Sequence, residues 1–404
     1  MSRLIVIGGG AAGFFLAVNA ARMHPGLHVT ILEKSGKLLS KVKVSGGGRC
    51  NVTHHCEDII AMSKCYPRGQ HFIKKTFHQF FTSGTIEWFE ERGVKLKAEN
   101  DGRMFPVSDS SQTIIDCLLR EAARYEVDIM MNAEVISVKK EDNRFSLKLK
   151  DGRIVECDKL AIASGGYPKS DMFSWLKETG HTIEDPSPSL FTFNLPGHTI
   201  TKLMGVSVER ATIKIQGSKL QEQGPLLITH WGLSGPAILR LSAWGARELK
   251  EMNWNFNIQV NWVNKTEQVL MEEFEVNRRV NASRRISGKN ELGLPNRLWE
   301  YLLQEAGIKE ETRWADLPAI SRNKLIRLVC QHPFEIKGKT TFKEEFVTAG
   351  GINLSEVDPQ SMMSKKLPGL FFAGEVLDVD GITGGYNFQH AWTSGFIAAK
   401  HIKA

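Results

Sequence analysis

The sequence predicts an α/β fold organised around a doubly wound parallel sheet, and three observations lead to that prediction. A short apolar run at 4–7 is followed by three glycines, a helical segment at 11–23 and a second apolar run at 28–32. This order of strand, glycine turn, helix and strand is a βαβ unit. Two further apolar runs, at 160–163 and 369–373, have the composition of strands that are buried on both faces.

The composition is that of a globular protein with more than one domain. The chain has 404 residues, 42% of them hydrophobic and 24% charged. Its formal net charge of +7 favours anionic partners. None of the six cysteines forms a C-x-x-C pair, so we expect no zinc or other metal site and no dithiol centre. Scattered thiols are typical of a reducing compartment, and a cytoplasmic location is expected.

No membrane association is predicted. The apolar stretch at 4–18 follows Arg3 and resembles a signal peptide, but three glycines interrupt it and no clear cleavage site follows. No other stretch is long and apolar enough to span a bilayer.

The pattern along the chain divides it into three parts. We expect helices over 72–92 and from 111 onward, a third parallel strand at 128–131 and a meander of strands over 135–157. The proline-rich stretch 185–189 marks a boundary, beyond which antiparallel strands are expected. A charged helical segment covers 265–328, and the chain ends with a strand at 342–347, the strand at 369–373 and a closing helix. The domains expected are 1–188 with 341–404, 189–264 with 329–340, and 265–328.

The first glycine run predicts a dinucleotide site. Gly8-Gly9-Gly10-Ala11-Ala12-Gly13 fits G-x-G-x-x-G, in which Gly8 allows the tight turn, Gly10 lets a diphosphate reach the backbone and Gly13 lets helix and strand approach. The free amides at the helix N-terminus favour the phosphates. Glu33 ends the second strand, where a carboxylate accepts hydrogen bonds from ribose hydroxyls.

Two further glycine motifs favour FAD over NAD. The loop Ser45-Gly46-Gly47-Gly48-Arg49-Cys50-Asn51 lets backbone amides lie close to a ring or a phosphate. Near the C-terminus, Gly374-Glu375 follows a strand and a glycine-rich turn precedes the helix that carries Tyr386 and Asn387. A helix N-terminus facing the flavin pyrimidine would stabilise negative charge on the reduced ring, and NAD sites use no such distant element.

These motifs, together with Gly102-Arg103-Met104-Phe105-Pro106 and Thr229-His230-Trp231-Gly232-Leu233-Ser234-Gly235-Pro236, resemble those of the BaiN-like or aminoacetone-oxidase-like bacterial flavoproteins. The resemblance covers nearly the whole chain. It departs at Leu39-Ser40, where the family often has Gly-Arg. The resemblance implies a Rossmann-like FAD domain built from both ends of the chain, a β-barrel-like insert and a small helical insert within it.

The motifs and the resemblance together give a set of expected FAD contacts. They are Gly8, Gly10, Ala12, Gly13, Glu33, Lys34, Lys41, Ser45, Gly47, Gly48, Arg49, Cys50, Asn51, Val135, Ala163, Ser164, Gly165, Gly166, Gly374, Glu375, Gly385, Tyr386, Asn387, Phe388 and Gln389.

Three residues are candidate catalytic groups, and each has a structural alternative. His230 is a possible acid or base in a polar turn, or a residue that caps the turn. Cys50 lies in a cationic loop that could lower its pKa, or it is a small packed residue beside the flavin. Tyr386 contacts the ring or fills the helix start. Arg103 could hold an anionic substrate or form a surface ion pair.

The leading functional hypothesis is an FAD-dependent oxidoreductase that transfers hydride between a small molecule or NAD(P)H and the flavin. Only one dinucleotide fingerprint is present, so NAD(P)H would bind transiently or the substrate itself would supply the electrons. The basic stretch 277–285 motivates an alternative, an RNA-directed flavoprotein related to tRNA-modifying enzymes, although a solvated helix end also explains it. A flavin-bound sensor without turnover is the third hypothesis. The oligomeric state is not predicted.

Overall fold

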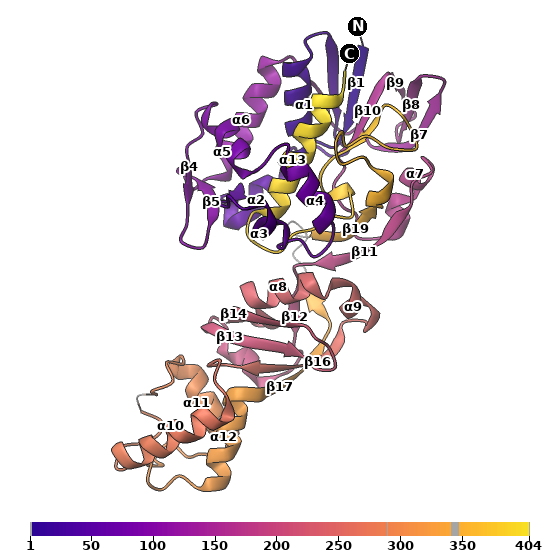
Figure 1. Ribbon diagram of the computed structural model, residues 1–404. Coiled ribbons are helices and arrows are strands. Elements are labelled where there is room, and N and C mark those ends of the chain that lie inside the picture. Colours follow the sequence, from indigo (N-terminus) through magenta and orange to yellow (C-terminus); the bar gives the residue numbers. More distant parts are fainter. Residues whose placement is uncertain (1, 289, 341–346, 404) are drawn as a thin grey trace. The chain divides into compact units, whose positions relative to one another are not determined.

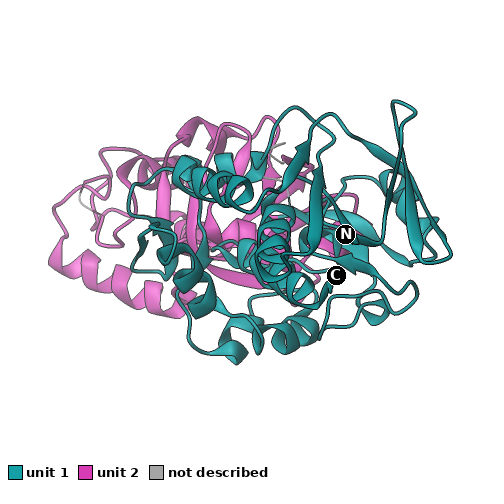
Figure 2. Ribbon diagram, turned by 90° about the horizontal axis from the view of Figure 1, so that it is seen from above, with its two compact units in different colours: residues 1–189, 342–404 teal, residues 190–341 magenta. Residues whose placement is uncertain are grey.

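The computed structural model describes residues 2–288, 290–340 and 347–403. The chain forms two compact units, which Figure 2 distinguishes by colour. Unit 1 consists of Met1–Ser189 and Phe342–Ala404, and unit 2 consists of Leu190–Thr341. The strand expected at 342–347 lies outside the described residues apart from Val347.

Unit 1 contains a five-stranded parallel sheet. Its strands are β1 (Ser2–Ile7), β2 (Leu27–Leu32), β6 (Asp128–Met130), β10 (Lys159–Ile162) and β20 (Leu370–Phe372). Their order is β20–β10–β1–β2–β6, so the strand from the C-terminal part joins the sheet at one edge. Leu4, Ile5 and Val6 of the central strand are fully buried, as expected for a strand covered on both faces.

Two helices from opposite ends of the chain pack against each other beside this sheet. They are α1 (Ala11–Met23) and α13 (Tyr386–His401) (Figure 1). Gly395 permits the close crossing, because a Cβ atom there would lie 3.0 Å from the carbonyl oxygen of Ala12. The rings of Phe15 and Trp392 fill the interface, with their centroids 5.1 Å apart. Both ends of the chain therefore contribute to one core.

The remaining helices of unit 1 are α2 (Ser40–Gly48), α3 (Ile59–Ser63), α4 (Gln70–Phe77), α5 (Thr82–Glu90), α6 (Ser111–Arg124) and α7 (Ser174–Lys177). The prediction that 72–92 is mostly helical is confirmed, although the chain leaves the helix between α4 and α5. Phe80 lies in that gap, and its ring stacks on Phe396 with centroids 4.2 Å apart. Burying this ring in the core takes precedence over a continuous helix.

Three small sheets complete unit 1. The predicted meander is confirmed as β7 (Val135–Glu141), β8 (Arg144–Leu149) and β9 (Ile154–Cys157). A second sheet has β5 (Arg103–Pro106) between β3 (Thr53–His54) and β4 (Leu96–Ala98). The third pairs β11 (Ile183–Ser189), which contains the proline-rich stretch, with β19 (Val347–Ile352).

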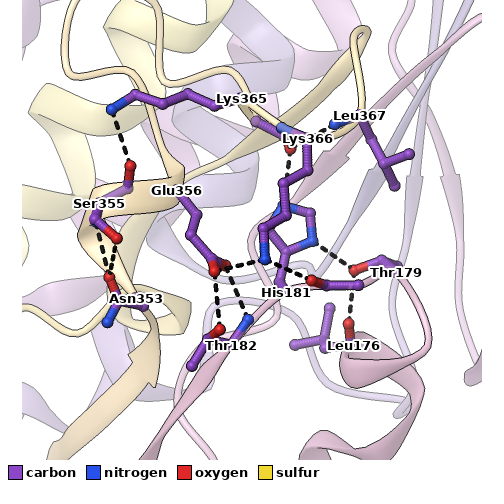
Figure 3. Close-up of polar contacts among 12 residues, drawn as sticks. Leu176, Thr179, His181, Thr182, Asn353, Ser355, Glu356, Lys365, Lys366 and Leu367 are labelled. Atoms are coloured by element: carbon purple, nitrogen blue, oxygen red, sulfur yellow. Dashed lines mark hydrogen bonds and ion pairs between the residues drawn. The ribbon is translucent and has the colours of Figure 1, made fainter.

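A buried polar network fastens the segment before β11 to residues 353–367 (Figure 3). His181 lies between two hydroxyl groups, with its Nδ1 2.7 Å from Thr179 Oγ1 and its Nε2 2.8 Å from Ser364 Oγ. Nearby, the carboxylate of Glu356 accepts hydrogen bonds from the amide and the hydroxyl of Thr182 and from Lys366 Nζ. Burial lowers the pKa of His181, so its neutral form belongs to the folded state.

Unit 2 is built on a seven-stranded antiparallel sheet. Its strands are β12 (Thr192–Asn194), β13 (Ser207–Ile215), β14 (Gln221–Ile228), β15 (Gly232–Ser234), β16 (Asn255–Asn261), β17 (His332–Lys337) and β18 (Lys339–Thr340). The order is β17–β16–β13–β14–β15–β12–β18. Only Gly338 separates the two edge strands β17 and β18 in sequence, so the sheet curls back on itself like a barrel.

Five α-helices accompany this sheet in the described part of unit 2. They are α8 (Pro236–Trp244), α9 (Ala246–Glu251), α10 (Glu267–Val280), α11 (Asn296–Glu305) and α12 (Ala319–Gln331). The last three form the helical insert between β16 and β17. The predicted fold class, a doubly wound α/β domain with a barrel-like and a small helical insert, is confirmed. Within the described ranges, no helix combines the length and hydropathy needed to cross a bilayer.

Candidate cofactor site

In the turn between β1 and α1, a side chain would clash with the backbone at Gly8 and Gly13 but would have space at Gly10. A Cβ atom on Gly8 would lie 2.3 Å from the carbonyl oxygen of Ala163, and one on Gly13 would lie 1.9 Å from that of Gly8. At Gly10 a Cβ atom would meet nothing within 4 Å. Among the described residues no side chain caps α1, so its first amides are available for an anion.

Glu33 connects the first glycine turn to the segment that follows β2. Its carboxylate accepts hydrogen bonds from the amide of Gly9 at 2.8 Å and from the amide of Ser35 at 2.9 Å. Beside it lies a pocket of about 250 Å³, whose lining includes Gly8, Glu33, Lys34, Val135, Ser164 and Tyr167. The structure thus brings together predicted residues from four separate segments, at the carboxyl end of the parallel strands. This edge is where open α/β sheets bind nucleotides.

The predicted glycine loop begins as a distorted helix end. α2 is assigned as far as Gly48, but Ser45, Gly46 and Gly47 depart from helical φ and ψ. Gly47 and Gly48 have φ angles of +68° and +84°, and a Cβ atom on either would meet nothing within 4 Å. Their amide backbone is therefore exposed to a neighbouring group, as expected for a loop that holds a ring or phosphate.

The structure distinguishes between the two alternatives for Cys50, a thiol with a lowered pKa and a packed side chain. It is fully buried, and burial raises the pKa of its thiol to about 12. Of the two alternatives for Cys50, a lowered pKa in a cationic loop is therefore wrong, and the structure shows a packed side chain. The Arg49 guanidinium pairs with Glu99 at 2.7 Å and lies over the ring of Phe105. Cys50 is consequently a protonated, packed side chain.

The glycine loop meets the C-terminal helix directly. A Cβ atom on Gly385 would lie 2.5 Å from the carbonyl oxygen of Thr53. The side-chain amide of Asn51 bridges the Gly385 amide and the Thr53 carbonyl, at 2.9 Å and 3.0 Å. The Thr53 hydroxyl donates to Gln389 Oε1 at 2.6 Å. Among the described residues no side chain of the N-cap caps α13 either. The N-termini of α1 and α13, from opposite ends of the chain, therefore both leave backbone amides uncapped in unit 1.

A third group of predicted residues gathers around Glu375. One of its carboxylate oxygens accepts from Lys41 Nζ at 2.5 Å and the other from the amide of Thr348 at 2.8 Å. A Cβ atom on Gly166 would lie 3.1 Å from Glu375 and 2.5 Å from Thr348 Oγ1. That hydroxyl is buried and has no hydrogen-bond partner among the described residues. A buried polar atom without a partner next to a glycine-lined surface fits a polar ligand.

Tyr386 lies in a cluster that the sequence did not reveal. Its ring stacks on His54 with centroids 4.9 Å apart, and its carbonyl oxygen accepts from the hydroxyl of buried Tyr66 at 2.7 Å. His54 Nδ1 lies 3.1 Å from the carbonyl oxygen of Gly384. Burial lowers the pKa of His54, which favours a neutral imidazole. The position of His54, three residues after the glycine loop, was the available signal.

A buried ion pair holds the chain just before this glycine turn. Arg68 Nε donates to Asp380 Oδ1 at 2.5 Å, and the hydroxyl of Ser189 donates to the other carboxylate oxygen at 2.8 Å. Asp380 is fully buried, and burial raises its pKa against the opposing effect of the guanidinium. The pair fixes the start of the turn that leads to Gly384 and Gly385.

The two other candidates are more exposed. His230 belongs to unit 2, where its exposed ring contacts Trp231 with centroids 4.0 Å apart. Arg103 pairs with Asp101 at 2.7 Å and with Glu99 at 2.8 Å, and 39% of its side chain is exposed. The surface ion pair is thus the arrangement that the structure shows for Arg103.

These features of unit 1 fit a dinucleotide with a diphosphate, as FAD requires. The glycines that no side chain could replace allow a ligand to approach the backbone closely. The amides of the second glycine loop and the Thr348 hydroxyl, which has no partner among the described residues, are available to hydrogen-bond with it. Lys41 and Lys34 supply cations beside them.

Comparison with known proteins gives one family and several full-length relatives. The family model described as "HI0933-like protein Rossmann domain" matches residues 2–401. A ribosomal RNA dihydrouridine synthase of Escherichia coli K12 is 32% identical over 99% of this chain and 98% of its own length. A 3-dehydro-bile acid delta(4,6)-reductase of Clostridium scindens is 28% identical over the same shares.

Among solved structures, the fold is similar to that of a 3-ketosteroid-delta4-(5alpha)-dehydrogenase from Rhodococcus jostii RHA1. The TM-score is 0.52, with 12% sequence identity over 99% of this chain and 97% of the other. This likeness supports the fold alone.

Proposed function

Since the chain belongs to the HI0933-like family of FAD-binding flavoproteins and is an FAD-dependent oxidoreductase, we propose that it reduces a carbon–carbon double bond conjugated to a carbonyl group, in a uracil base of RNA. The membership confirms the resemblance inferred from the motifs. Bound FAD supplies hydride chemistry, and the protein supplies binding and orientation.

We assign the parts of FAD to the residue groups described above. Gly8, Gly10, Ala12 and Gly13, with the first amides of α1, would hold the diphosphate. Glu33, Lys34 and the pocket lined by Val135 and Ser164 would hold the adenosine. The flavin end would lie among the remaining predicted contacts, which are Lys41, Ser45, Gly47, Gly48, Arg49, Cys50, Asn51, Ala163, Gly165, Gly166, Gly374, Glu375, Gly385, Tyr386, Asn387, Phe388 and Gln389.

The names of the two relatives share one kind of chemistry. A dihydrouridine synthase saturates the C5–C6 bond of uracil, which is conjugated to the C4 carbonyl, and a delta(4,6)-reductase saturates a double bond conjugated to the 3-keto group of a bile acid. In both substrates hydride adds to the carbon remote from the carbonyl, and a proton must reach the carbon beside it. A positioned proton donor and a polar contact to the carbonyl oxygen are therefore what the site must offer.

The charge distribution is the observation that favours RNA over a steroid. Residues 190–341 contain 21 Lys and Arg against 15 Asp and Glu, so unit 2 carries +6 of the formal +7. Unit 1, which contains the proposed FAD site, is close to neutral. A steroid-like substrate needs an apolar pocket and no such excess, whereas a polyphosphate partner is attracted by it.

The test measures dihydrouridine in RNA. Ribosomal RNA from a strain lacking the gene should contain less dihydrouridine than RNA from the parent, as nucleoside mass spectrometry reports. Purified protein with FAD and NADPH or NADH, under anaerobic conditions, should restore the nucleoside to the deficient RNA. Equal dihydrouridine content in both strains, together with no product in vitro, contradicts the proposal. If the protein reduced a steroid 4,6-dien-3-one and no RNA, the proposed reaction type would stand and the proposed RNA substrate would be wrong.

A further inference from the structure

Four exposed arginines lie on the last turn of α10 and on the two paired backbone segments that follow it and precede α12. Arg279 belongs to the last turn of α10, Arg284 and Arg285 follow that helix, and Arg313 lies on the segment before α12. We call these four residues the arginine patch. Arg285 and Arg313 are direct cross-strand neighbours in an antiparallel bridge, so their side chains leave the backbone side by side.

The patch stands on a rigid base. Three backbone hydrogen bonds join 282–286 to 312–315, from Ala315 to Ala282, from Trp314 to Arg284 and from Ile286 to Thr312, at 3.1, 3.0 and 2.9 Å. Beneath them Trp314 is buried against Phe274, with ring centroids 5.2 Å apart. Trp299 Nε1 donates to the carbonyl oxygen of buried Ile286 at 2.9 Å. The guanidinium groups are therefore presented from a fixed backbone.

No carboxylate neutralises the patch. Of the described residues, none places a carboxylate oxygen within 4.0 Å of a guanidinium nitrogen of these four arginines. The neighbouring arginines behave differently, since Arg278 and Arg322 both pair with Glu275. The dipole of α10 favours cations in its last turn, which accounts for Arg279. It does not account for Arg284, Arg285 and Arg313, which lie beyond the helix.

The opposed pair Arg285 and Arg313 has an energetic cost. Like charges directly across a strand pair repel each other and destabilise the local fold. An anion bound between them would replace that repulsion by attraction. Because each guanidinium presents a planar fork of donors, a phosphate group with several acceptor oxygens matches the patch better than a single carboxylate does.

We propose that the arginine patch binds the phosphate backbone of RNA and holds the substrate RNA on unit 2. The identity of the partner as RNA rests on the proposed function, while the anion-binding character rests on the four unpaired guanidinium groups. Backbone contacts of this kind carry little sequence information and position the nucleic acid. The inference thus separates where the RNA is held from where a base is reduced.

The experiment uses the full-length, FAD-loaded protein and a fluorescently labelled RNA stem-loop. Fluorescence anisotropy over a salt series gives the affinity of the wild type, of R284E/R285E and of K214E/K219E. The control reverses two exposed lysines elsewhere in unit 2, so the two variants have the same net charge. FAD content and Tm show that each variant is folded.

We expect R284E/R285E to bind about 30-fold more weakly, with a salt slope lower by about 2, because two phosphate contacts are lost. K214E/K219E should retain most of the affinity. An equal loss of RNA affinity in both variants, or no RNA binding by the wild type at low salt, would contradict the proposal that the arginine patch binds RNA. So would binding of the wild type to phosphatidylserine vesicles in place of RNA.

The outcome also separates this inference from the proposed function. If the wild type binds the stem-loop through the patch but forms no dihydrouridine in ribosomal RNA, the proposed function fails and the patch remains. If dihydrouridine forms and R284E/R285E keeps the wild-type affinity and salt slope, the patch fails and the function remains.

Discussion

Units 1 and 2 handle charge in opposite ways. In unit 1 the important charges are buried or paired, as in Arg68 with Asp380 and Lys41 with Glu375. In unit 2 the arginine patch is exposed and unpaired among the described residues, and the unit holds nearly all of the net charge. In unit 1 the paired charges hold backbone segments around the proposed cofactor site, as Glu375 does with Lys41 and the amide of Thr348. Unit 2 has the charge that the proposed RNA substrate would require.

The largest effect should come from breaking the glycine cradle of unit 1. Gly13→Ala places a Cβ atom 1.9 Å from the carbonyl oxygen of Gly8, so we expect loss of FAD and a free energy of unfolding lower by at least about 3 kcal/mol. A helix interior alone would favour alanine by about 1 kcal/mol, and the steric clash outweighs that gain. Absorbance of bound flavin and chemical denaturation measure the two effects.

Gly10→Ala is the matched control, because its Cβ atom meets no protein atom within 4 Å. The variant should fold with nearly the wild-type free energy of unfolding and yet bind FAD more weakly, since the new methyl group occupies the space proposed for the diphosphate. Normal FAD affinity in Gly10→Ala would count against that assignment.

The next effect concerns paired and unpaired charges. Asp380→Asn leaves Arg68 without its carboxylate in a buried position, and we expect the free energy of unfolding to fall by about 3 to 5 kcal/mol. Arg284→Gln in the exposed patch should change it by less than about 0.5 kcal/mol. Urea denaturation of both variants tests the contrast between the units, and comparable losses would refute it.

A smaller effect is expected from pH. His390 is buried in α13, and burial lowers its pKa to about 4. The folded state therefore favours the neutral ring, so stability is complete above the unfolded pKa of about 6.5 and falls as the pH drops toward 4. Between about pH 7.5 and pH 5 the free energy of unfolding should fall by about 2 kcal/mol from this residue.

His390→Gln should remove that part of the pH dependence. His54, His181 and His198, whose pKa values are also lowered by burial, leave a smaller slope of the same sign. Urea denaturation as a function of pH measures it, and an unchanged slope in His390→Gln would show that the ring is not the source.

The sequence predicted the βαβ unit well because local signals define it, whereas the barrel-like insert was implied by the family resemblance. Glycine at 8, 10 and 13 and the short apolar strands leave few alternatives. The break between α4 and α5 was not predictable, because no glycine or proline marks it and Phe80 leaves the helix only to reach Phe396, more than three hundred residues away.

The candidate site likewise combines features that local sequence signals predict and features that depend on contacts distant in sequence. The glycine-rich segments were visible as motifs, but His54, Thr348 and the pair of Arg68 with Asp380 acquire their roles from contacts that are distant in sequence. The choice between the two alternatives for Cys50 could not be made from the sequence, since burial of the thiol and the pairing of Arg49 with Glu99, fifty positions away, appear only in the fold.

The packing of α1 against α13 has a consequence for biosynthesis. Ribosomes deliver a polypeptide in order, at about 5 to 20 residues per second, and domains fold as units. Helix α13 is translated only after all of unit 2, so the apolar face of α1 must wait, uncovered, while the intervening 190–341 emerge. The core of unit 1 can therefore close only after the segment that carries Gly395 has left the exit tunnel.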